Sequence, residues 1–216
     1  MAVIAITGRK GGIGKSTITA NLAVELLSLR QTVAILDADP QRSLVAWAAL
    51  GDGILADVVR PVDATHPRQF RAEVEAAAGR ASRVLIDTPP GFADPALLAA
   101  LCADLVLLPA GPSPLDIMAA RDALTLAREA QAQRGGGKPL IRFVPSKVTA
   151  RTTLGRDLAA SLGDFGEPVL PGIGQRTIAA EAALSGLTVR EAAMGSACQV
   201  EFAALAAAVE KVLKKL

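Results

Sequence analysis

The chain has 216 residues, of which 51% are hydrophobic and 20% charged, and its formal net charge is +2. A chain of this length buries a substantial core without disulfides or a structural metal. The near-balance of charge excludes a histone-like or RNA-coating protein, and the 3% aromatic content disfavours a single-strand binder that stacks bases. Two cysteines and one histidine are too few for a zinc site and are typical of a reducing compartment.

The predicted elements alternate between strands and helices along the chain. Continuous apolar runs, typical of strands covered on both faces, occur at residues 3–7, 32–36, 83–86, 105–108 and 140–144. Longer segments of helical period lie at residues 15–30, 115–133 and 201–216. This order predicts an α/β fold with a doubly wound, mostly parallel sheet. Because no repeat or linker divides the chain, we expect one domain over residues 1–216.

Neither the N-terminus nor the most apolar stretch of the chain carries a signal for export or for spanning a bilayer. The N-terminus lacks the basic stretch and apolar run of a signal peptide. The longest apolar window, residues 96–110, contains Asp104 and is too short to span a bilayer. We therefore expect a cytoplasmic protein.

The segment between the first predicted strand and the first predicted helix carries the strongest chemical signal. It reads Lys10-Gly11-Gly12-Ile13-Gly14-Lys15-Ser16-Thr17. Glycines let backbone N–H groups converge on phosphate oxygens, and the N-terminus of the following helix favours negative charge. Lys15 would reach the β- and γ-phosphates, and the Ser16 hydroxyl would ligate Mg²⁺. A dinucleotide loop fits poorly, because Thr17 stands where its third glycine belongs.

This phosphate loop departs from the standard pattern: Arg9 stands where the first glycine belongs, and an extra lysine, Lys10, precedes the glycine pair. In this departure the chain resembles the ParA/MinD family of deviant Walker A ATPases, which are P-loop NTPases. The resemblance covers most of the chain. Residues 37–41 (DADPQ) look like the family's first switch, and residues 84–91 (VLIDTPPG) look like its Walker B strand and second switch.

The length of the chain adds to this resemblance. Residues 108–119, which include PSPLD, are similar to the short, ParF-like partition ATPases. Those proteins lack the extra N-terminal DNA-binding domain of long plasmid ParA proteins. Because the first strand is predicted to begin at residue 3, we expect this chain to lack that domain as well.

The resemblance implies an ATPase that hydrolyses ATP to ADP and phosphate with Mg²⁺ and forms a homodimer around two ATP molecules. Residues 11–17 would bind the nucleotide, and Lys10 would reach across to the partner's phosphates, as an arginine finger does. Asp39 would orient the attacking water beside the γ-phosphate. Asp87 would hold Mg²⁺ together with Ser16.

The remaining implied positions concern the switches and the base. Asp37 has two open roles, as part of the metal shell or as a capping carboxylate at the end of its strand. Residues 88–91 would form the loop that senses the γ-phosphate. Pro171 would lie near the adenine, although a proline at a strand end needs no ligand to explain it.

The charge is distributed unevenly. Residues 1–120 hold 10 basic and 12 acidic side chains, whereas residues 121–216 hold 13 basic and 9 acidic ones. No acidic residue lies between Glu129 and Asp157. Non-specific DNA affinity comes from neutralisation of DNA phosphates by basic side chains. The basic half of the chain, residues 121–216, therefore predicts contacts to duplex DNA. The candidates are Lys138, Lys147, Arg151, Arg156, Arg176 and Arg190, with Arg134 and Arg142 in the same tract.

Together these features predict a nucleoid-associated ATPase that dimerises with ATP, binds DNA non-specifically and positions a plasmid, a chromosome region or a protein organelle. A ParB-like or other adaptor protein would stimulate it. The main alternative is a MinD-like membrane ATPase, in which the apolar stripe of residues 202–216 would lie on a membrane rather than pack in the core. An iron-protein-like electron carrier and a small-molecule kinase or ligase with the same loop are weaker alternatives.

Overall fold

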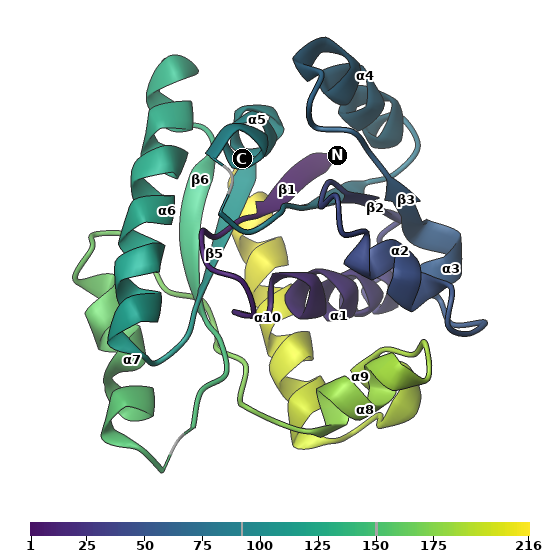
Figure 1. The fold of residues 1–216 in the computed structure, drawn as a ribbon, viewed down its shortest axis with the longest axis vertical. Coiled ribbons are helices and arrows are strands. Elements are labelled where there is room, and N and C mark those ends of the chain that lie inside the picture. The colour runs from purple at the N-terminus through teal and green to yellow at the C-terminus, as the bar shows by residue number, and fades with distance from the viewer. Residues whose placement is uncertain (92, 150) are drawn as a thin grey trace.

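The fold is an α/β fold built on a six-stranded parallel sheet, as the sequence predicts. The computed structural model describes residues 1–91, 93–149 and 151–216. The strands stand in the order β3-β2-β4-β1-β5-β6, and every neighbouring pair is parallel (Figure 1). The strands are β1 (Ala2–Ile6), β2 (Val33–Asp37), β3 (Val59–Pro61), β4 (Arg83–Asp87), β5 (Leu105–Ala110) and β6 (Leu140–Pro145).

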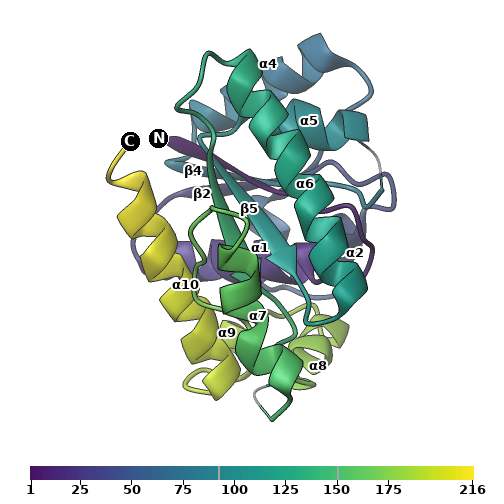
Figure 2. The same cartoon turned by 90° about the vertical axis from the view of Figure 1, so that its left-hand side faces the viewer.

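Helices cover both faces of the sheet. Figure 2 shows the sheet between α6 on one side and α10 on the other. The helices are α1 (Lys15–Ser28), α2 (Ser43–Ala48), α3 (Leu55–Val58), α4 (Pro67–Ala78), α5 (Ala93–Cys102), α6 (Pro114–Gln133), α7 (Thr153–Gly163), α8 (Ile178–Leu184), α9 (Val189–Ala192) and α10 (Ala197–Leu213). None of the helices in these ranges is long and apolar enough to cross a bilayer.

The continuous apolar strands divide the core into two layers. In β1, Val3 and Ala5 pack with α4, α5, α6 and α7, whereas Ile4 and Ile6 pack with α1, α2 and α10. Alternate residues of a strand point to opposite faces, so a strand buried on both faces is apolar at every position. This arrangement explains why the five longer strands were recognisable from their sequence.

The structure adds one strand that the sequence analysis did not predict. Strand β3 has three residues, pairs with β2 at the edge of the sheet and ends in a proline. Only Val59 of the three is buried. One buried side chain gives neither an apolar run nor an alternation, so the sequence carries no usable signal for this strand.

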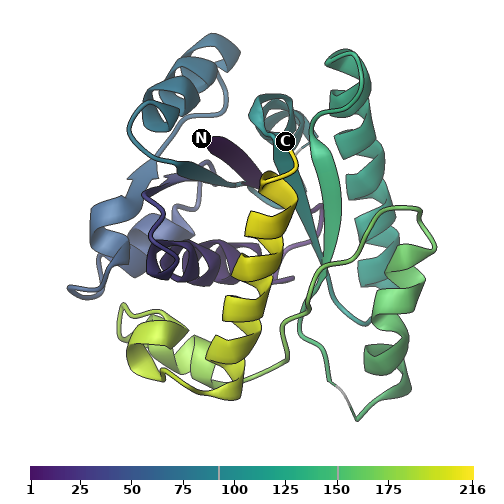
Figure 3. The same ribbon diagram turned by 180° about the vertical axis from the view of Figure 1, so that it is seen from behind.

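The C-terminal helix packs against the sheet and begins earlier than predicted. It starts at Ala197 because Ser196 caps it, with the Ser196 Oγ accepting the Gln199 N–H at 3.3 Å. Its stripe from Phe202 to Leu213 is buried in the same core layer as α1, which lies beside it in Figure 3. Leu216, which the stripe was expected to include, lies beyond the helix end and is 46% exposed.

Candidate nucleotide site

Three strands end side by side at the edge of the sheet where the phosphate loop begins. Strand β1 leads into the loop, and the register pairs Ile6 of β1 with Asp87 of β4 and Asp87 with Asp37 of β2. In parallel sheets, ligands bind in the crevice outside the carboxyl ends of the strands. The two carboxylates and the loop are therefore brought together by the topology.

Two glycines of the phosphate loop have a left-handed backbone conformation. Gly12 and Gly14 have φ of +74° and +93°, a region that L side chains rarely adopt. Ser146, at the end of β6, donates a hydrogen bond to the Ile13 carbonyl oxygen at 2.7 Å. A Cβ at Gly14 would lie 3.0 Å from the Ser146 Oγ. The loop is thus fixed by contacts from a strand about 130 residues away.

Lys15 begins α1 and points back into the loop. Its residue is only 6% exposed, and its Nζ donates to the Lys10 carbonyl oxygen at 3.3 Å. Burial lowers the pKa of the Lys15 ammonium, while the nearby carboxylates Asp87 and Asp39 act in the opposite direction. A buried cation that faces the crevice is suited to an anionic ligand such as a phosphate group.

The oxygen atoms expected to hold Mg²⁺ lie in contact with one another. Ser16 Oγ donates to Asp87 Oδ2 at 2.6 Å, and Thr19 Oγ1 donates to Asp87 Oδ1 at 3.2 Å. Burial raises the pKa of Asp87 to about 7, against the effect of these hydrogen bonds and of Lys15. A hydroxyl and a carboxylate are the hard oxygen donors that Mg²⁺ prefers, and a divalent cation would favour the charged carboxylate. These residues fit the metal.

The first switch is folded around Asp37. Its Oδ1 accepts the Asp39 N–H at 3.1 Å, and its Oδ2 accepts the N–H groups of Leu44 and Val45 at 3.1 Å each. Burial raises the pKa of Asp37, although these hydrogen bonds oppose the rise. Of its two expected roles, the structure shows the capping role, at the start of α2. Asp39, 8% exposed, is held in the crevice by this cap.

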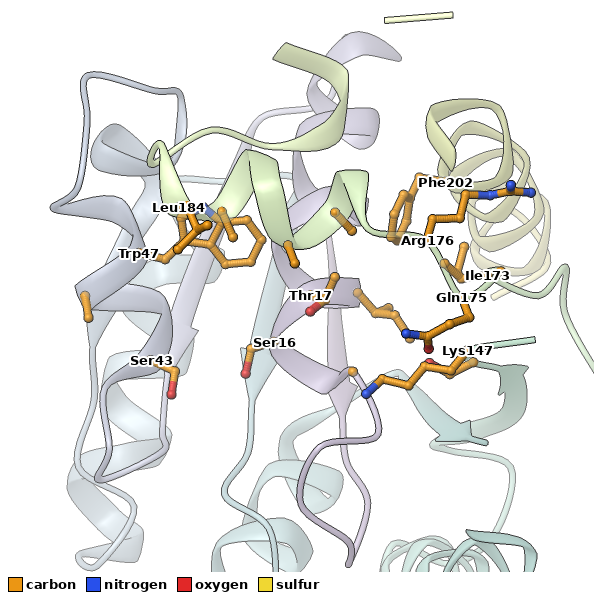
Figure 4. A pocket seen from close by; sticks show the side chains of 18 of the residues that line it. Ser16, Thr17, Ser43, Trp47, Lys147, Ile173, Gln175, Arg176, Leu184 and Phe202 are labelled. Atoms are coloured by element: carbon orange, nitrogen blue, oxygen red, sulfur yellow. The ribbon is translucent and has the colours of Figure 1, made fainter. Parts of the chain in front are cut away.

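A cavity of about 650 Å³ extends from the phosphate loop, under α8, to α2 (Figure 4). Gly14, Ser16 and Thr17 line its polar end. Apolar side chains from distant segments form the rest of it, among them Trp47, Ile173, Ala183, Leu184 and Phe202. A polar end next to a larger apolar chamber is the general form of a small-molecule site.

Of two further expected site residues, one lines this cavity and the other lines a neighbouring cavity. Pro171 lines a neighbouring cavity of about 760 Å³, which shares Gly174, Gln175 and Arg176 with the first. Lys147 lines the first cavity and extends toward the phosphate loop (Figure 4). Its backbone is left-handed, with φ of +55°, which is uncommon for a residue other than glycine.

Three of the six candidate DNA-binding residues already form ion pairs with carboxylates. Lys138 pairs with Asp104 at 2.8 Å, Arg176 with Glu201 at 2.6 Å, and Arg190 with the buried Glu25 at 2.8 Å. The sequence tract is free of acids, but the fold brings carboxylates to it from elsewhere in the chain. Lys147, Arg151 and Arg156 are exposed and form no salt bridge within the described ranges. Of the six candidates, these three have no acidic partner within those ranges, and contact of any of them with DNA stays a prediction.

Sequence reasoning missed several residues of the site. Thr19 and Ser146 support Asp87 and the phosphate loop, and Asp116 of α6 forms an ion pair with Lys10 at 2.6 Å. Only Thr19 could have been found, because it lies one helical turn after Lys15 on the same face. The other two contacts join segments more than 100 residues apart.

Comparison with known proteins gives a family model and several relatives. The model described as CobQ/CobB/MinD/ParA nucleotide binding domain matches residues 4–189. The chain is 39% identical over 117 residues to the maintenance of carboxysome distribution protein A of Gloeobacter kilaueensis, covering 53% of this chain and 51% of that protein. It is 30% identical over 192 residues to the protein of the same name from Halothiobacillus neapolitanus, covering 86% and 85%. Over 223 residues it is 30% identical to the chromosome-partitioning ATPase Soj of Thermus thermophilus, covering 87% of each.

Solved structures have the same fold. Apo McdA of Cyanothece matches with a TM-score of 0.80 and 18% identity, covering 97% of this chain and 99% of that one. MinD of Pyrococcus horikoshii OT3, complexed with Mg-ADP, matches with a TM-score of 0.76 and 21% identity, covering 98% and 97%. At these identities the likeness concerns the fold.

Proposed function

The chain belongs to the CobQ/CobB/MinD/ParA nucleotide-binding family, and on that premise we propose that it is an ATP-hydrolysing protein that positions a cargo. Proteins of the ParA and MinD branches are ATPases. The relatives named above act, by their names, in carboxysome distribution and chromosome partitioning. Positioning of a large cargo is what these activities share, and we propose it for this chain together with an adaptor protein that stimulates hydrolysis.

The observation that carries the proposal is the convergence of Lys15, Ser16 and Asp87 beside the phosphate loop. Phosphoryl transfer to water requires mainly positioning and charge stabilisation. Lys15 and the N–H groups at the start of α1 would hold the phosphates. Mg²⁺, ligated by Ser16 and held through a water by Asp87, would neutralise phosphate charge. Asp39 would orient the attacking water.

We propose that the 650 Å³ cavity receives the nucleoside. The cavity joins the phosphate loop at Gly14, Ser16 and Thr17, so a nucleotide whose phosphates occupy the loop has its base within reach of the cavity. Lys147, at the edge of the cavity, would then contact the nucleotide rather than DNA. This leaves Arg151 and Arg156, at the beginning of α7, as the residues for duplex DNA.

We propose a homodimer with ATP as the form that binds DNA. Within the described ranges Arg151 and Arg156 form no salt bridge, and a dimer doubles the number of phosphate contacts that these two arginines offer. The apolar stripe of α10, which a membrane-associated function would use, packs in the core instead. A DNA-bound positioning function therefore has more support in this chain than a membrane-bound one.

The test compares size in solution and retention on duplex DNA with ATP, with ADP and in Lys10→Ala. Dimerisation and DNA retention with ATP alone support the proposal, and a monomer in ATP contradicts it. The Arg151→Ala/Arg156→Ala variant should dimerise normally but bind DNA with a shallower salt dependence, by about 0.9 in the logarithmic slope for each lost phosphate contact. Arg68→Ala, which removes an exposed arginine of α4, is the matched control.

A further inference from the structure

Lys10, the extra lysine of the phosphate loop, is already bound within its own chain. Its Nζ lies 2.6 Å from Asp116 Oδ1, 106 positions along the sequence. The Lys10 side chain is 42% exposed and that of Asp116 is 14% exposed. Helix α6, which carries Asp116, begins at the end of the sheet where the phosphate loop lies (Figure 1). The pair therefore ties the loop to the first turn of α6.

The position of Asp116 is built by its surroundings. Ser113 caps α6, with its Oγ accepting the Asp116 N–H at 3.1 Å. A Cβ at Gly111 would lie only 2.5 Å from Asp116 Oδ2, so the loop before the helix leaves room for this carboxylate. Partial burial acts to raise the pKa of Asp116, but hydrogen bonds with Lys10 and Ser113 and the Lys10 charge lower it. The carboxylate is ionised at neutral pH.

We infer that Asp116 restrains Lys10 in the monomer and so opposes formation of the ATP dimer. The inference rests on the proposed function, in which Lys10 binds the partner's phosphates. An ammonium group that keeps its carboxylate would bring a negative group next to those phosphates, and like charges at that distance repel. Lys10 must therefore leave Asp116 before it can neutralise phosphate charge in the other protomer.

The restraint makes dimerisation depend more steeply on the charge of the nucleotide. Forming one dimer breaks two Lys10–Asp116 pairs, and only the phosphates of the bound nucleotides replace them. The γ-phosphate of ATP adds negative charge that ADP lacks, so ATP offsets the lost pairs and ADP does not. Asp116 would thus lower the population of dimers in the ADP state and in the absence of nucleotide.

The test is the dimer dissociation constant of Asp116→Asn in saturating ATP and in ADP. Partly exposed ion pairs make small contributions, and two are broken per dimer, so the variant should dimerise about fivefold to thirtyfold more tightly than the wild type in ATP. Its ADP form should also begin to dimerise. Asp122→Asn, which alters an exposed carboxylate on the same helix, should change neither constant.

Two further variants keep the test independent of any damage to α6. Gly111→Ala leaves Asp116 in the chain but crowds its carboxylate, and should tighten the dimer in the same direction. In the Lys10→Ala background, Asp116→Asn should bring no gain. A dimer that is equally tight or weaker in Asp116→Asn, with the protein folded, overturns the inference, whereas a wild type that never dimerises in ATP overturns the proposed function instead.

A measurement on the monomer tests the ion pair itself. The pKa of the Asp116 carboxyl, followed by carbon-13 NMR without nucleotide, should rise in Lys10→Ala because its lysine partner is gone. An unchanged pKa would mean that Lys10 is not held by Asp116 in solution. This outcome would overturn the inference even if the protein dimerises with ATP as proposed.

Discussion

The buried carboxyl of Asp87 makes a quantitative prediction about pH and stability. Burial raises its pKa from 3.8 to about 7 in the folded chain, so the folded state binds the proton more tightly than the unfolded state. The stabilisation is complete below the unfolded pKa and is lost as the pH rises through about 7. Each pKa unit corresponds to about 1.36 kcal/mol, so the loss is of the order of 4 kcal/mol.

The substitution Asp87→Asn removes this dependence. Asn is neutral at every pH, and its Oδ1 can still accept the Ser16 hydroxyl. Without nucleotide and metal, we expect the free energy of unfolding of the variant to exceed that of the wild type by about 1.5 kcal/mol near pH 5 and by about 4 kcal/mol near pH 8, because the loss accumulates between the two pKa values. Asp37, whose pKa burial also raises, is present in both proteins, and its charge is one of the causes that raise the pKa of Asp87 in the wild type.

Urea unfolding at the two pH values measures the difference, with the exposed Asp57→Asn as the control. With Mg²⁺ and nucleotide the wild type, rather than Asp87→Asn, should have the larger free energy of unfolding, because the metal favours the ionised carboxylate. The added stabilisation of the wild type should be larger near pH 8 than near pH 5, and Asp87→Asn should gain less. Equal pH dependence of stability in Asp87→Asn and the wild type would refute the reasoning.

Three further substitutions test the cavity, the loop and the core. Lys147→Ala should weaken ATP binding about threefold to tenfold in a fluorescence titration, through loss of one charge-assisted contact, whereas Arg151→Ala should leave it unchanged. Gly14→Ala forces a side chain into φ of +93° beside the Ser146 Oγ, so it should cost about 1–3 kcal/mol in urea unfolding and weaken ATP binding at least about tenfold. Phe202→Ala should cost about 3–5 kcal/mol because the ring is completely buried, and a cost under about 1 kcal/mol would mean that α10 does not pack as described.

Much of the fold could be predicted because its signals are local. The strands are buried on both faces, so each reads as an unbroken apolar run, and the phosphate loop is a contiguous motif between a strand and a helix. Strand β3 could not be predicted, because only Val59 of its three residues is buried. The roles proposed for Asp39 and Asp87 come from the family resemblance, because spacing alone does not distinguish these residues from ordinary capping carboxylates.

The surroundings of individual basic residues could not be predicted from the distribution of charge along the sequence. Arg190 lies in the basic half of the chain, yet it is partly exposed and pairs with the buried Glu25, 165 positions earlier. Lys147 was grouped with DNA contacts by its neighbours in the sequence, whereas the fold brings it to the cavity beside Ser16. Ion pairs and cavities join segments that are distant in sequence, so local charge counts cannot assign individual residues.

Without a nucleotide, the charged groups of the site compensate one another. Lys15 contacts the Lys10 carbonyl, Lys10 binds Asp116, and Asp87, whose pKa burial raises to about 7, accepts the Ser16 hydroxyl. Each of these contacts occupies a group that the proposed mechanism needs for phosphate or metal. A ligand must therefore supply negative charge to both lysines and positive charge to Asp87, and a magnesium nucleotide supplies both. We therefore expect a free phosphate or a metal ion alone to bind more weakly than a magnesium nucleotide, because each satisfies only half of the proposed site.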